Sequence, residues 1–415
     1  MQGRLGRAAA CTSFPPCDND HVTQNLIEPA APITVRVPGA AYPIRIEEGL
    51  LGRAGEALGP LLANRKVFLL SDTNVWKIWG KKLIQSFKPL RPAVILISPG
   101  ERYKRLVTVE KITDMLAEHG AERSSLLVVF GGGVVGDMGA FAASVYLRGI
   151  DYVQIPTTLL AQVDSAIGGK TGVNLGVGKN LVGTFYQPRM VLSDPDVLRT
   201  LPPRELRAGL FEALKCAVIG DPELFEYLEA GRERILRCDP EALRVVIRAS
   251  SALKGRVVSS DEKEGGLRRV LNFGHTAGHA LEAATQYRRF LHGEAVAWGM
   301  LAATRLAADH GRLPLQDAER ITRLIVSYGP VPSLDGVAPA ALASHLAVDK
   351  KVRDGKLHFV LPRRIGEVEV TPGITAREVI GVVRQLARRN PFAKNPFARN
   401  SIAKRGRAAA PSRKP

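Results

Sequence analysis

Short apolar runs rich in β-branched residues alternate with longer segments of helical periodicity through the first half of the chain. The runs lie at 67–70, 94–97, 126–130 and 152–155, and segments of helical length such as 74–87 and 106–119 separate them. This alternation predicts an α/β domain with a mostly parallel sheet that helices cover on both faces. Ligands of such sheets bind at the carboxyl ends of the strands.

The pattern changes after about Leu201. The β signal fades, and long amphipathic stretches rich in Ala, Leu, Glu and Arg take over, before one short β-like run at 357–361. We therefore expect an N-terminal extension at 1–31, the α/β domain at 32–200, an all-α domain at 201–387 and a tail at 388–415.

The net charge of +18 is concentrated in that tail. Nine Lys or Arg and no acid lie between Arg388 and Lys414, and the unit Asn-Pro-Phe-Ala repeats from Asn390. Low complexity and a single charge sign predict a solvated tail that contributes to no core. Salt-dependent contact with RNA is the alternative, but no specific nucleic-acid partner is expected.

The apolar runs and the cysteines indicate the cellular location of the protein. No apolar run approaches the ~20 residues of a membrane span, and residues 1–31 lack the apolar core of a signal peptide. The four cysteines are scattered without close pairs, which favours free thiols. We expect a cytoplasmic protein.

A glycine-rich loop follows the run at 126–130. Gly131, Gly133 and Gly136 satisfy G-x-G-x-x-G directly before an Ala-rich helical segment, where backbone amides at a helix start can bind a pyrophosphate. A purely structural glycine turn is the alternative. The ordinary dinucleotide fold has an acid at the end of the next strand, but Thr157 and Thr158 stand there, so Asp72 and Glu101 at earlier strand ends are the candidates.

Two lysines lie in glycine-rich stretches after this loop. Lys170 belongs to Gly168-Gly169-Lys170-Thr171-Gly172-Val173-Asn174, and Lys179 precedes Asn180. Either lysine alone is more often a surface charge. Together with the surrounding hydroxyls and amides they favour an anionic, oxygen-rich small molecule.

Three histidines lie within eighteen residues, at 275, 279 and 292. His275 and His279 share one face of a helix, as metal ligands do in zinc proteases, and spacing alone makes them the ligand pair. Thr276 replaces the acid that a zinc protease needs beside its first histidine, which argues against peptide hydrolysis.

Eight motifs lie along the chain: Pro99-Gly100-Glu101 with Lys104, the 131–137 loop, Gln162-Val163-Asp164-Ser165, 168–174, 178–181, Glu212-Ala213-Leu214-Lys215, 271–276 and 291–295. With these motifs, the chain from about Val37 to Leu386 resembles the 3-dehydroquinate synthase family of sugar phosphate cyclases. The resemblance implies a Rossmann-like NAD-binding domain, an α-helical domain that binds Zn²⁺ or Co²⁺, an active site between them, and a homodimer.

The resemblance also implies roles for individual residues. The metal ligands would be Glu212, His275 and His292, with His279 beside the substrate instead. Arg148 would reach the neighbouring subunit's site. The residues implied for substrate are Asp164, Lys170, Lys179, Asn180, Lys215, Arg268, Asn272 and Lys350, with Lys351 and Lys356 competing for the last role. Those implied for NAD are Asp72, Asn74, Glu101, Lys104, Gly132, Gly133, Asp137, Thr157, Thr158, Asp164, Lys170, Lys179, Thr200 and Glu205.

The implied reaction converts 3-deoxy-D-arabino-heptulosonate 7-phosphate to 3-dehydroquinate and phosphate, with NAD reduced and regenerated in each turnover. A polyol dehydrogenase would need no residues that bind a phosphate, so Lys170, Lys215 and Arg268 argue against this alternative. Another cyclase, such as 2-deoxy-scyllo-inosose synthase, acts on a substrate without a carboxylate, and Arg268 favours one that has it. Without the family pattern, Glu212 could simply pair with Lys215, and Asp164 and Asp137 could be helix caps.

One departure from the family pattern concerns packing. Ala277 stands where the family usually has phenylalanine, and a lost ring leaves a cavity unless a neighbour fills it. Trp298, where smaller residues are common, is the candidate for the compensating bulk.

Overall fold

The computed structural model describes residues 32–348, 352–353 and 356–394. The N-terminal extension, most of the tail, Lys350 and Lys351 lie outside these residues, as does the side chain of Lys356. The described chain forms two compact units. The α/β unit contains residues 32–216 and 230–268, and the helical unit contains residues 217–229 and 269–394. The units therefore interleave along the chain, whereas the sequence pattern indicated a single change near residue 200.

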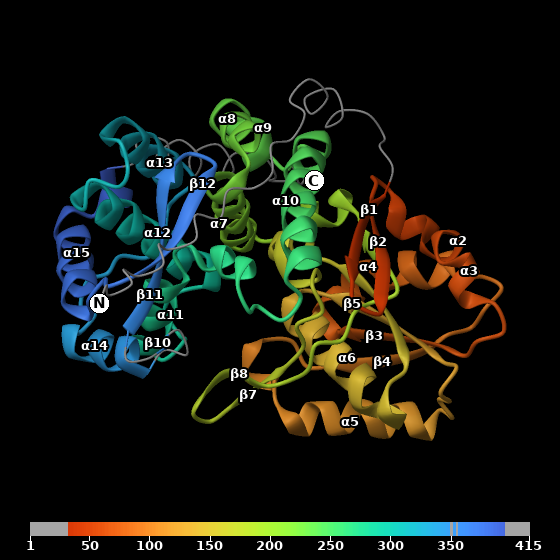
Figure 1. The fold of residues 1–415 in the computed structure, drawn as a ribbon. Helices are drawn as coiled ribbons and strands as arrows, with labels where there is room; N and C mark the ends of the chain where they lie inside the picture. The colour runs from red at the N-terminus through yellow and green to blue at the C-terminus, as the bar shows by residue number, and fades with distance from the viewer. Residues whose placement is uncertain (1–31, 349–351, 354–355, 395–415) are drawn as a thin grey trace, which may run out of the picture. The chain divides into compact units, whose positions relative to one another are not determined.

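A seven-stranded sheet organises the α/β unit (Figure 1). Its strands, in spatial order, are β1 (Ile33–Val37), β2 (Ala40–Ile46), β9 (Val191–Ser193), β6 (Asp151–Pro156), β5 (Leu126–Gly131), β3 (Val67–Asp72) and β4 (Ala93–Ile97). Only β1 and β2 pair antiparallel, and every other neighbouring pair is parallel. The mostly parallel sheet and the four strands predicted from apolar runs are confirmed.

The strand order indicates where in the sheet a ligand is expected to bind. From β3 the chain passes to β4 at one edge, then returns to β5 on the other side of β3 and continues outward through β6 and β9. The connections from β3 and β5 therefore leave in opposite directions, and in sheets of this kind ligands bind at the carboxyl ends of two such strands. Ser71 pairs with Phe130 in the register, so Asp72 and the glycine loop begin side by side.

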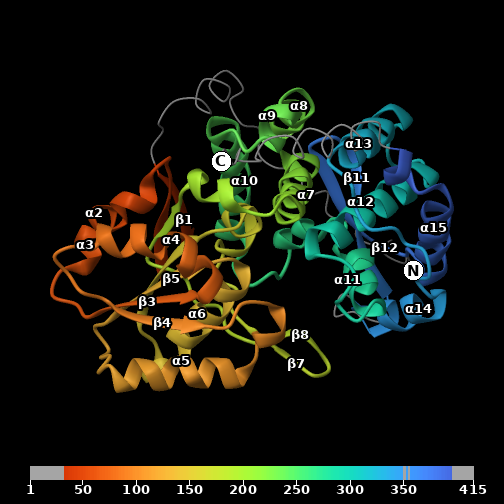
Figure 2. The same cartoon turned by 180° about the vertical axis from the view of Figure 1, so that it is seen from behind.

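Helices cover both faces of the sheet at β3 and β4. α5 (Leu106–Glu118) and α6 (Gly133–Val145) pack on one face, where they share an apolar core with alternate residues of β3, β4 and β5. α4 (Thr73–Ser86) lies on the other side of these strands, as Figures 1 and 2 show from front and back. A Cβ on Gly139 would lie 2.7 Å from Val129 Cγ1, so α6 packs on the sheet at a distance that only glycine permits there.

This unit contains further elements outside the seven-stranded sheet. They are α2 (Ala54–Ala57), α3 (Gly59–Leu62), the hairpin of β7 (Val173–Leu175) and β8 (Gly178–Val182), most of α7 (Pro203–Gly220), α9 (Arg232–Leu236) and α10 (Pro240–Ser260). α10 packs against β1 and β2.

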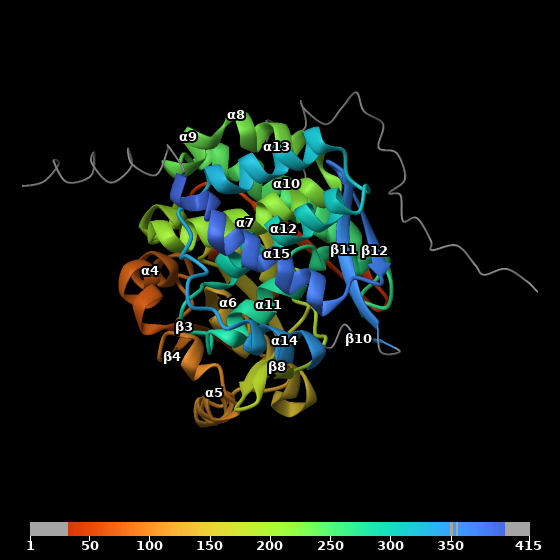
Figure 3. The same ribbon diagram turned by 90° about the vertical axis from the view of Figure 1, so that its left-hand side faces the viewer.

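The helical unit is built around α12 (His292–Asp309), most of which is buried. It contacts α11 (His275–Ala284), α13 (Leu315–Ser327), α15 (Ala376–Arg389) and strand β11 (Lys356–Arg364), an arrangement visible in Figure 3. The other elements are α8 (Pro222–Ala230), α14 (Pro339–Val348), β10 (Val352–Arg353) and β12 (Glu367–Pro372). The β-like run at 357–361 is part of β11, which pairs with β10 and β12 in a sheet that the sequence pattern did not predict.

Small residues bring α11 and α12 into backbone contact. A Cβ on Gly299 would lie 1.8 Å from the Gly274 carbonyl oxygen, and one on Gly278 would lie 3.1 Å from that of Ala295. Any larger residue at 299 would force the helices apart. This close packing sets the separation between the histidines on α11 and the histidine that begins α12.

The first repeat of the basic tail belongs to the core of the helical unit. Phe392 is 4 % exposed, and its ring meets Trp298 edge to face with centroids 4.8 Å apart. A Cβ on Gly329 would lie 2.8 Å from the same ring. The expectation that the tail contributes to no core was therefore wrong for Phe392. Trp298 also donates its Nε1–H to the Pro332 carbonyl at 2.9 Å. Trp298→Ala would therefore remove several contacts at once and could not by itself measure packing against Ala277. That Trp298 compensates for Ala277 stays a prediction.

We expect Phe392→Ala to lower the free energy of unfolding by about 3 kcal/mol, since an aromatic side chain is removed from a packed site. Denaturant unfolding measures the change. Leu315→Ala is the control, because Leu315 is 73 % exposed in the same unit and should change stability by less than about 0.5 kcal/mol. Equal effects of the two substitutions would show that Phe392 is not part of the core.

None of the helices in the described part of the chain has the length and apolar character that crossing a membrane requires.

Candidate active site

The glycine loop shapes a cradle for a phosphate group at the start of α6. Gly132 is the N-cap of α6, and a Cβ there would lie 2.8 Å from Thr158 Cγ2. A Cβ on Gly133 would lie 3.0 Å from Ser165 Oγ. The absence of a Cβ at both positions lets the loop pack closely against Thr158 and Ser165, and the backbone amides and dipole at the helix start provide positive potential. These features fit the pyrophosphate of a dinucleotide.

Polar residues predicted for NAD lie beside this loop. Asp72 ends β3 and caps α4, accepting hydrogen bonds from the amides of Asn74 at 2.8 Å and Val75 at 3.0 Å. Thr157 is held against the loop because its amide donates to the Gly131 carbonyl at 3.0 Å. Its buried hydroxyl has no hydrogen-bond partner among the described residues, while Thr158 Oγ1 accepts from the Ala161 amide at 3.2 Å. The cap leaves the second carboxylate oxygen of Asp72 available to a ligand.

A buried lysine connects two predicted contacts. Lys104 is 4 % exposed, and its Nζ lies 2.5 Å from Asp137 Oδ2 and 2.5 Å from Asn180 Oδ1. Burial raises the pKa of Asp137, and the Lys104 charge opposes that rise. Glu101 lies at the edge of the group, where it accepts from Asn174 Nδ2 at 2.7 Å.

Thr200 and Glu205 lie further along the chain. Thr200 ends a 3₁₀ helix, Pro195–Thr200, and its hydroxyl accepts from Trp79 Nε1 of α4 at 2.9 Å. Glu205 lies in the first turn of α7. This hydrogen bond connects Thr200 to α4, the helix that begins beside Asp72. Sequence reasoning missed Trp79, because it belongs to no motif.

Asp164 organises a cluster of buried charges. It lies in a π-helical turn, Ala161–Ser165, a distortion that is frequent at functional sites. Its Oδ1 lies 2.6 Å from Lys254 Nζ and 3.9 Å from Lys215 Nζ. Lys215 also pairs with Glu212, so the pairing considered from the sequence is present, and Glu212 is fully buried.

The two lysines of this cluster respond differently to their surroundings. Burial disfavours the charge on Lys215, yet Asp164 and Glu212 raise its pKa above the ordinary lysine value. Burial lowers the pKa of Lys254 in spite of Asp164. The two ammonium groups are balanced by two carboxylates, Asp164 and Glu212, and their N–H groups are donors of the kind that binds an anion such as a phosphate.

Sequence reasoning missed Lys254. It lies on the buried face of α10 with Ser250, Ser251 and Val258, at spacings of three and four residues. A lysine on the apolar stripe of an amphipathic helix was the available signal, because lysine is rarely buried without a partner.

Arg268 and Lys170 flank the segment that begins at Gly168. Arg268 is 1 % exposed and donates from Nη2 to the Gly168 carbonyl at 3.0 Å and from Nη1 to the Glu262 carbonyl. Its Nε is buried without a hydrogen-bond partner among the described residues. Lys170 is exposed and pairs with Glu264. An arginine with an unused buried N–H can bind a carboxylate, although burial lowers the pKa of its guanidinium.

The other predicted contacts lie on short elements. Lys179 and Asn180 belong to β8, and Asn180 has a left-handed φ of 53°. Arg148 is exposed, and it follows Leu147 with φ values of 68° and 49°, a strained pair for residues with a Cβ. A reach of Arg148 into a neighbouring subunit stays a prediction.

The helical unit brings the three histidines together. One ligand atom from each of His275, His279 and His292 lies within 4.8 Å of the others. The ring centroids are 5.1 Å apart for 275 and 292, 5.3 Å for 275 and 279, and 5.6 Å for 279 and 292. Asn272 ends the 3₁₀ helix that precedes α11.

The hydrogen-bond partners of the His275 and His292 rings are of the kind that metal-binding histidines have. His275 Nδ1 lies 3.1 Å from the Phe273 carbonyl oxygen, and His292 Nδ1 lies 3.1 Å from Glu282 Oε2. Because a carbonyl and a carboxylate accept, each Nδ1 donates, and each Nε2 keeps its lone pair for a metal. Imidazoles oriented in this way are typical ligands of zinc and similar ions. Sequence reasoning missed Glu282, although it lies seven residues after His275 on the same helix face.

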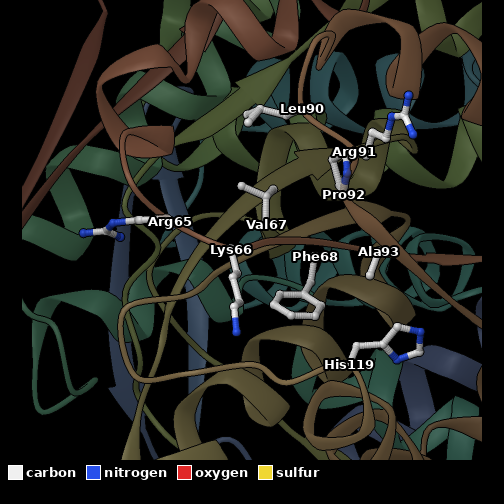
Figure 4. Close-up of a pocket in the computed structure, with 9 residues that line it drawn as sticks. All are labelled: Arg65, Lys66, Val67, Phe68, Leu90, Arg91, Pro92, Ala93 and His119. Carbon is white, nitrogen blue, oxygen red and sulfur yellow. The ribbon is translucent and has the colours of Figure 1, made fainter.

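A cavity of about 240 Å³ lies away from these groups, at the amino ends of β3 and β4. Its floor includes Val67 and Phe68, and Figure 4 shows that Arg65 and Arg91 extend in different directions. Arg65 is already paired with Asp151 at 2.6 Å. The cavity lies at the opposite end of the strands from the glycine loop and is not the candidate site.

Comparisons with known proteins identify the family of the chain. The family model described as 3-dehydroquinate synthase N-terminal matches residues 94–208, and that described as 3-dehydroquinate synthase C-terminal matches residues 209–352. The 3-dehydroquinate synthase of Solibacter usitatus is 48 % identical over 350 residues, which cover 84 % of this chain and 98 % of that protein. The enzyme of Nostoc punctiforme is 47 % identical over 359 residues, covering 85 % and 98 %.

Solved structures of similar fold carry cofactors. The 2-epi-5-epi-valiolone synthase of Streptomyces hygroscopicus, with NAD⁺ and Zn²⁺ bound, is 33 % identical with a TM-score of 0.77, covering 85 % of this chain and 99 % of that one. A 2-deoxy-scyllo-inosose synthase complexed with carbaglucose-6-phosphate, NAD⁺ and Co²⁺ is 28 % identical with a TM-score of 0.77, covering 86 % and 99 %. The chain belongs to the 3-dehydroquinate synthase family.

Proposed function

We propose that this protein is a 3-dehydroquinate synthase of the shikimate pathway, which leads to the aromatic amino acids. It is an NAD- and divalent-metal-dependent lyase that converts 3-deoxy-D-arabino-heptulosonate 7-phosphate to 3-dehydroquinate and phosphate. The observation that carries the proposal is the set of buried cations, Lys215, Lys254 and Arg268, in the same unit as the nucleotide loop. A dehydrogenase that only transfers hydride has no need of them.

The cofactors supply two functions when bound: NAD accepts and returns a hydride, and the divalent ion polarises a substrate oxygen. Gly132 and Gly133 would hold the pyrophosphate, and Asp72 would accept from a ribose hydroxyl. His275 and His292 would hold the metal, with Glu212 as the third ligand that the resemblance implies.

Residues of the α/β unit bind and orient the substrate. Lys215 and Lys254 donate N–H groups to its phosphate, and Asp164 keeps their ammonium groups in place. Arg268 binds the carboxylate, and Lys170 exchanges its pairing with Glu264 for an anionic group of the substrate. Stronger hydrogen bonds to the phosphate as its C–O bond breaks stabilise the leaving group.

Several expectations remain predictions within this proposal. The homodimer, the role of Arg148 across it, the cytoplasmic location and the role of residue 350 rest on the resemblance or on the sequence alone. A deletion that tests nucleic-acid binding by the tail should begin at residue 395, since Phe392 is part of the core. We expect cyclase activity to survive that deletion.

Phosphate release from the heptulosonate phosphate tests the proposal. Purified protein is assayed with and without NAD, and before and after chelation and zinc restoration. Release that requires both NAD and metal, without net NADH, is the expected result. Activity on glucose 6-phosphate instead would indicate another cyclase, and steady NADH production from a polyol would indicate a dehydrogenase.

A further inference from the structure

Hydrogen bonds to backbone carbonyls hold the segment from Gly168 to Lys170. The Gly168 carbonyl accepts from Arg268 Nη2 at 3.0 Å, and the Gly169 carbonyl accepts from the Tyr186 amide at 2.8 Å. Lys170 forms an isolated antiparallel bridge with Phe185. The position of Lys170 and that of the Arg268 guanidinium are thus coupled to the same short stretch of backbone.

Tyr42 provides the remaining anchor, from a strand more than a hundred residues away. The Gly168 amide donates to Tyr42 Oη at 2.9 Å. Tyr42 lies on β2, is 1 % exposed, and packs in an apolar cluster with Val35, Ile167 and Val258. Its ring is fixed by this packing, so the hydroxyl offers the Gly168 amide an acceptor in a defined position.

Gly168 cannot easily move to another partner. Its φ is +94°, which favours glycine, and a Cβ there would lie 2.6 Å from Arg268 Nη2. A buried N–H without an acceptor is unfavourable, so loss of the Tyr42 hydroxyl would release the segment from this conformation. Burial raises the pKa of Tyr42 to about 12, so the hydroxyl remains neutral at the pH values at which an enzyme works.

We propose that Tyr42 is a positioning residue for the anion-binding groups of the active site. By holding the Gly168 amide, it fixes the backbone that places Lys170 and that accepts from Arg268. The inference rests on the proposed function for the identity of the anion, but not for the anchor itself.

Tyr42→Phe tests the inference, because it removes the hydroxyl and keeps the ring. The matched control is Tyr328→Phe in the helical unit, where a fully buried tyrosine donates its hydroxyl to the Leu228 carbonyl at 2.9 Å. Each variant loses a buried hydrogen bond of a tyrosine hydroxyl, so a general loss of stability appears in both. Amide hydrogen exchange of a peptide spanning 166–172 and steady-state kinetics are measured for each.

In Tyr42→Phe we expect faster exchange in that peptide and a KM for the sugar phosphate that is raised about tenfold, with kcat changed much less. Tyr328→Phe should change neither exchange at 166–172 nor KM. Unchanged exchange in Tyr42→Phe would overturn the anchor, and faster exchange with wild-type KM would overturn its role in anion binding. Failure of the proposed function would be seen separately, as a wild-type protein that releases no phosphate from the heptulosonate.

Discussion

His275→Ala and His292→Ala should each leave the protein without tightly bound metal, whereas His279→Ala should keep the metal and lose turnover. The first two rings orient Nε2 toward the cluster through partners at Nδ1, the Phe273 carbonyl and the Glu282 carboxylate. Loss of a direct ligand should weaken binding by more than the roughly 10–100-fold that follows loss of an outer hydrogen-bond partner. Activity should fall with metal content.

His279 separates two interpretations of the same cluster. Its spacing from His275 indicates a ligand pair, and its ring is close enough to both others to be one of them. The family resemblance instead places His279 beside the substrate, with Glu212 as the third ligand. If His279→Ala binds zinc as poorly as His275→Ala, the spacing was the better guide and the assignment of Glu212 is wrong.

Metal content after removal of excess zinc is the measurement, independent of turnover. His310→Ala is the control, because His310 is in the same unit and pairs only at the surface with Glu378, at 2.9 Å. Glu282→Gln gives an intermediate case. It should weaken zinc affinity by about 10–100-fold while activity returns at saturating zinc. Wild-type zinc content in His275→Ala would contradict the proposed metal site.

Local sequence patterns predicted those features that depend on neighbours along the chain. The apolar runs at 67–70 and 126–130 are strands β3 and β5, and the glycine loop begins α6 because β5 ends there. Histidines four residues apart on one helix face are close in any helix. The strand order was not predicted, although it explains why Asp72, before the loop in sequence, lies next to it.

Features that depend on distant packing were missed. Nothing in the repeat around Phe392 distinguishes it from a solvated tail, because its burial requires Trp298 and Gly329. Lys254 occupies an amphipathic helix in which a lysine is ordinary, and only the turn at Asp164 gives it a buried partner. Tyr42 stands in no motif, and its role depends on an amide far along the chain.

Lys254→Met should both destabilise the α/β unit and lower kcat/KM by about a hundredfold or more, since one N–H donor to the leaving phosphate is lost. Removing one member of a buried ion pair costs about 3–5 kcal/mol, because the other charge stays without compensation. Asp164 is 21 % exposed and retains Lys215 at 3.9 Å, so we expect a loss of stability below that range, about 2–3 kcal/mol.

Stability and catalysis can be separated with paired variants. Asp164→Asn combined with Lys254→Met should be less destabilising than the sum of the single changes, because neither charge is then left alone. Activity should not recover in the double variant, since the phosphate still lacks its donor. Lys66→Met is the control for loss of a lysine charge. Its pair with Glu122 is more than half exposed on both sides and should contribute less than about 1 kcal/mol.

Denaturant unfolding and phosphate-release kinetics are measured on the same preparations. A Lys254→Met protein with reduced stability and normal kcat/KM would assign Lys254 to packing alone, and the phosphate would then depend on Lys215. A protein of normal stability that has lost activity would show that the Asp164 pair adds little to folding. In that case the pairing with Asp164 positions Lys254 for the substrate. The burial that lowers the pKa of Lys254 then follows from its place on the buried face of α10.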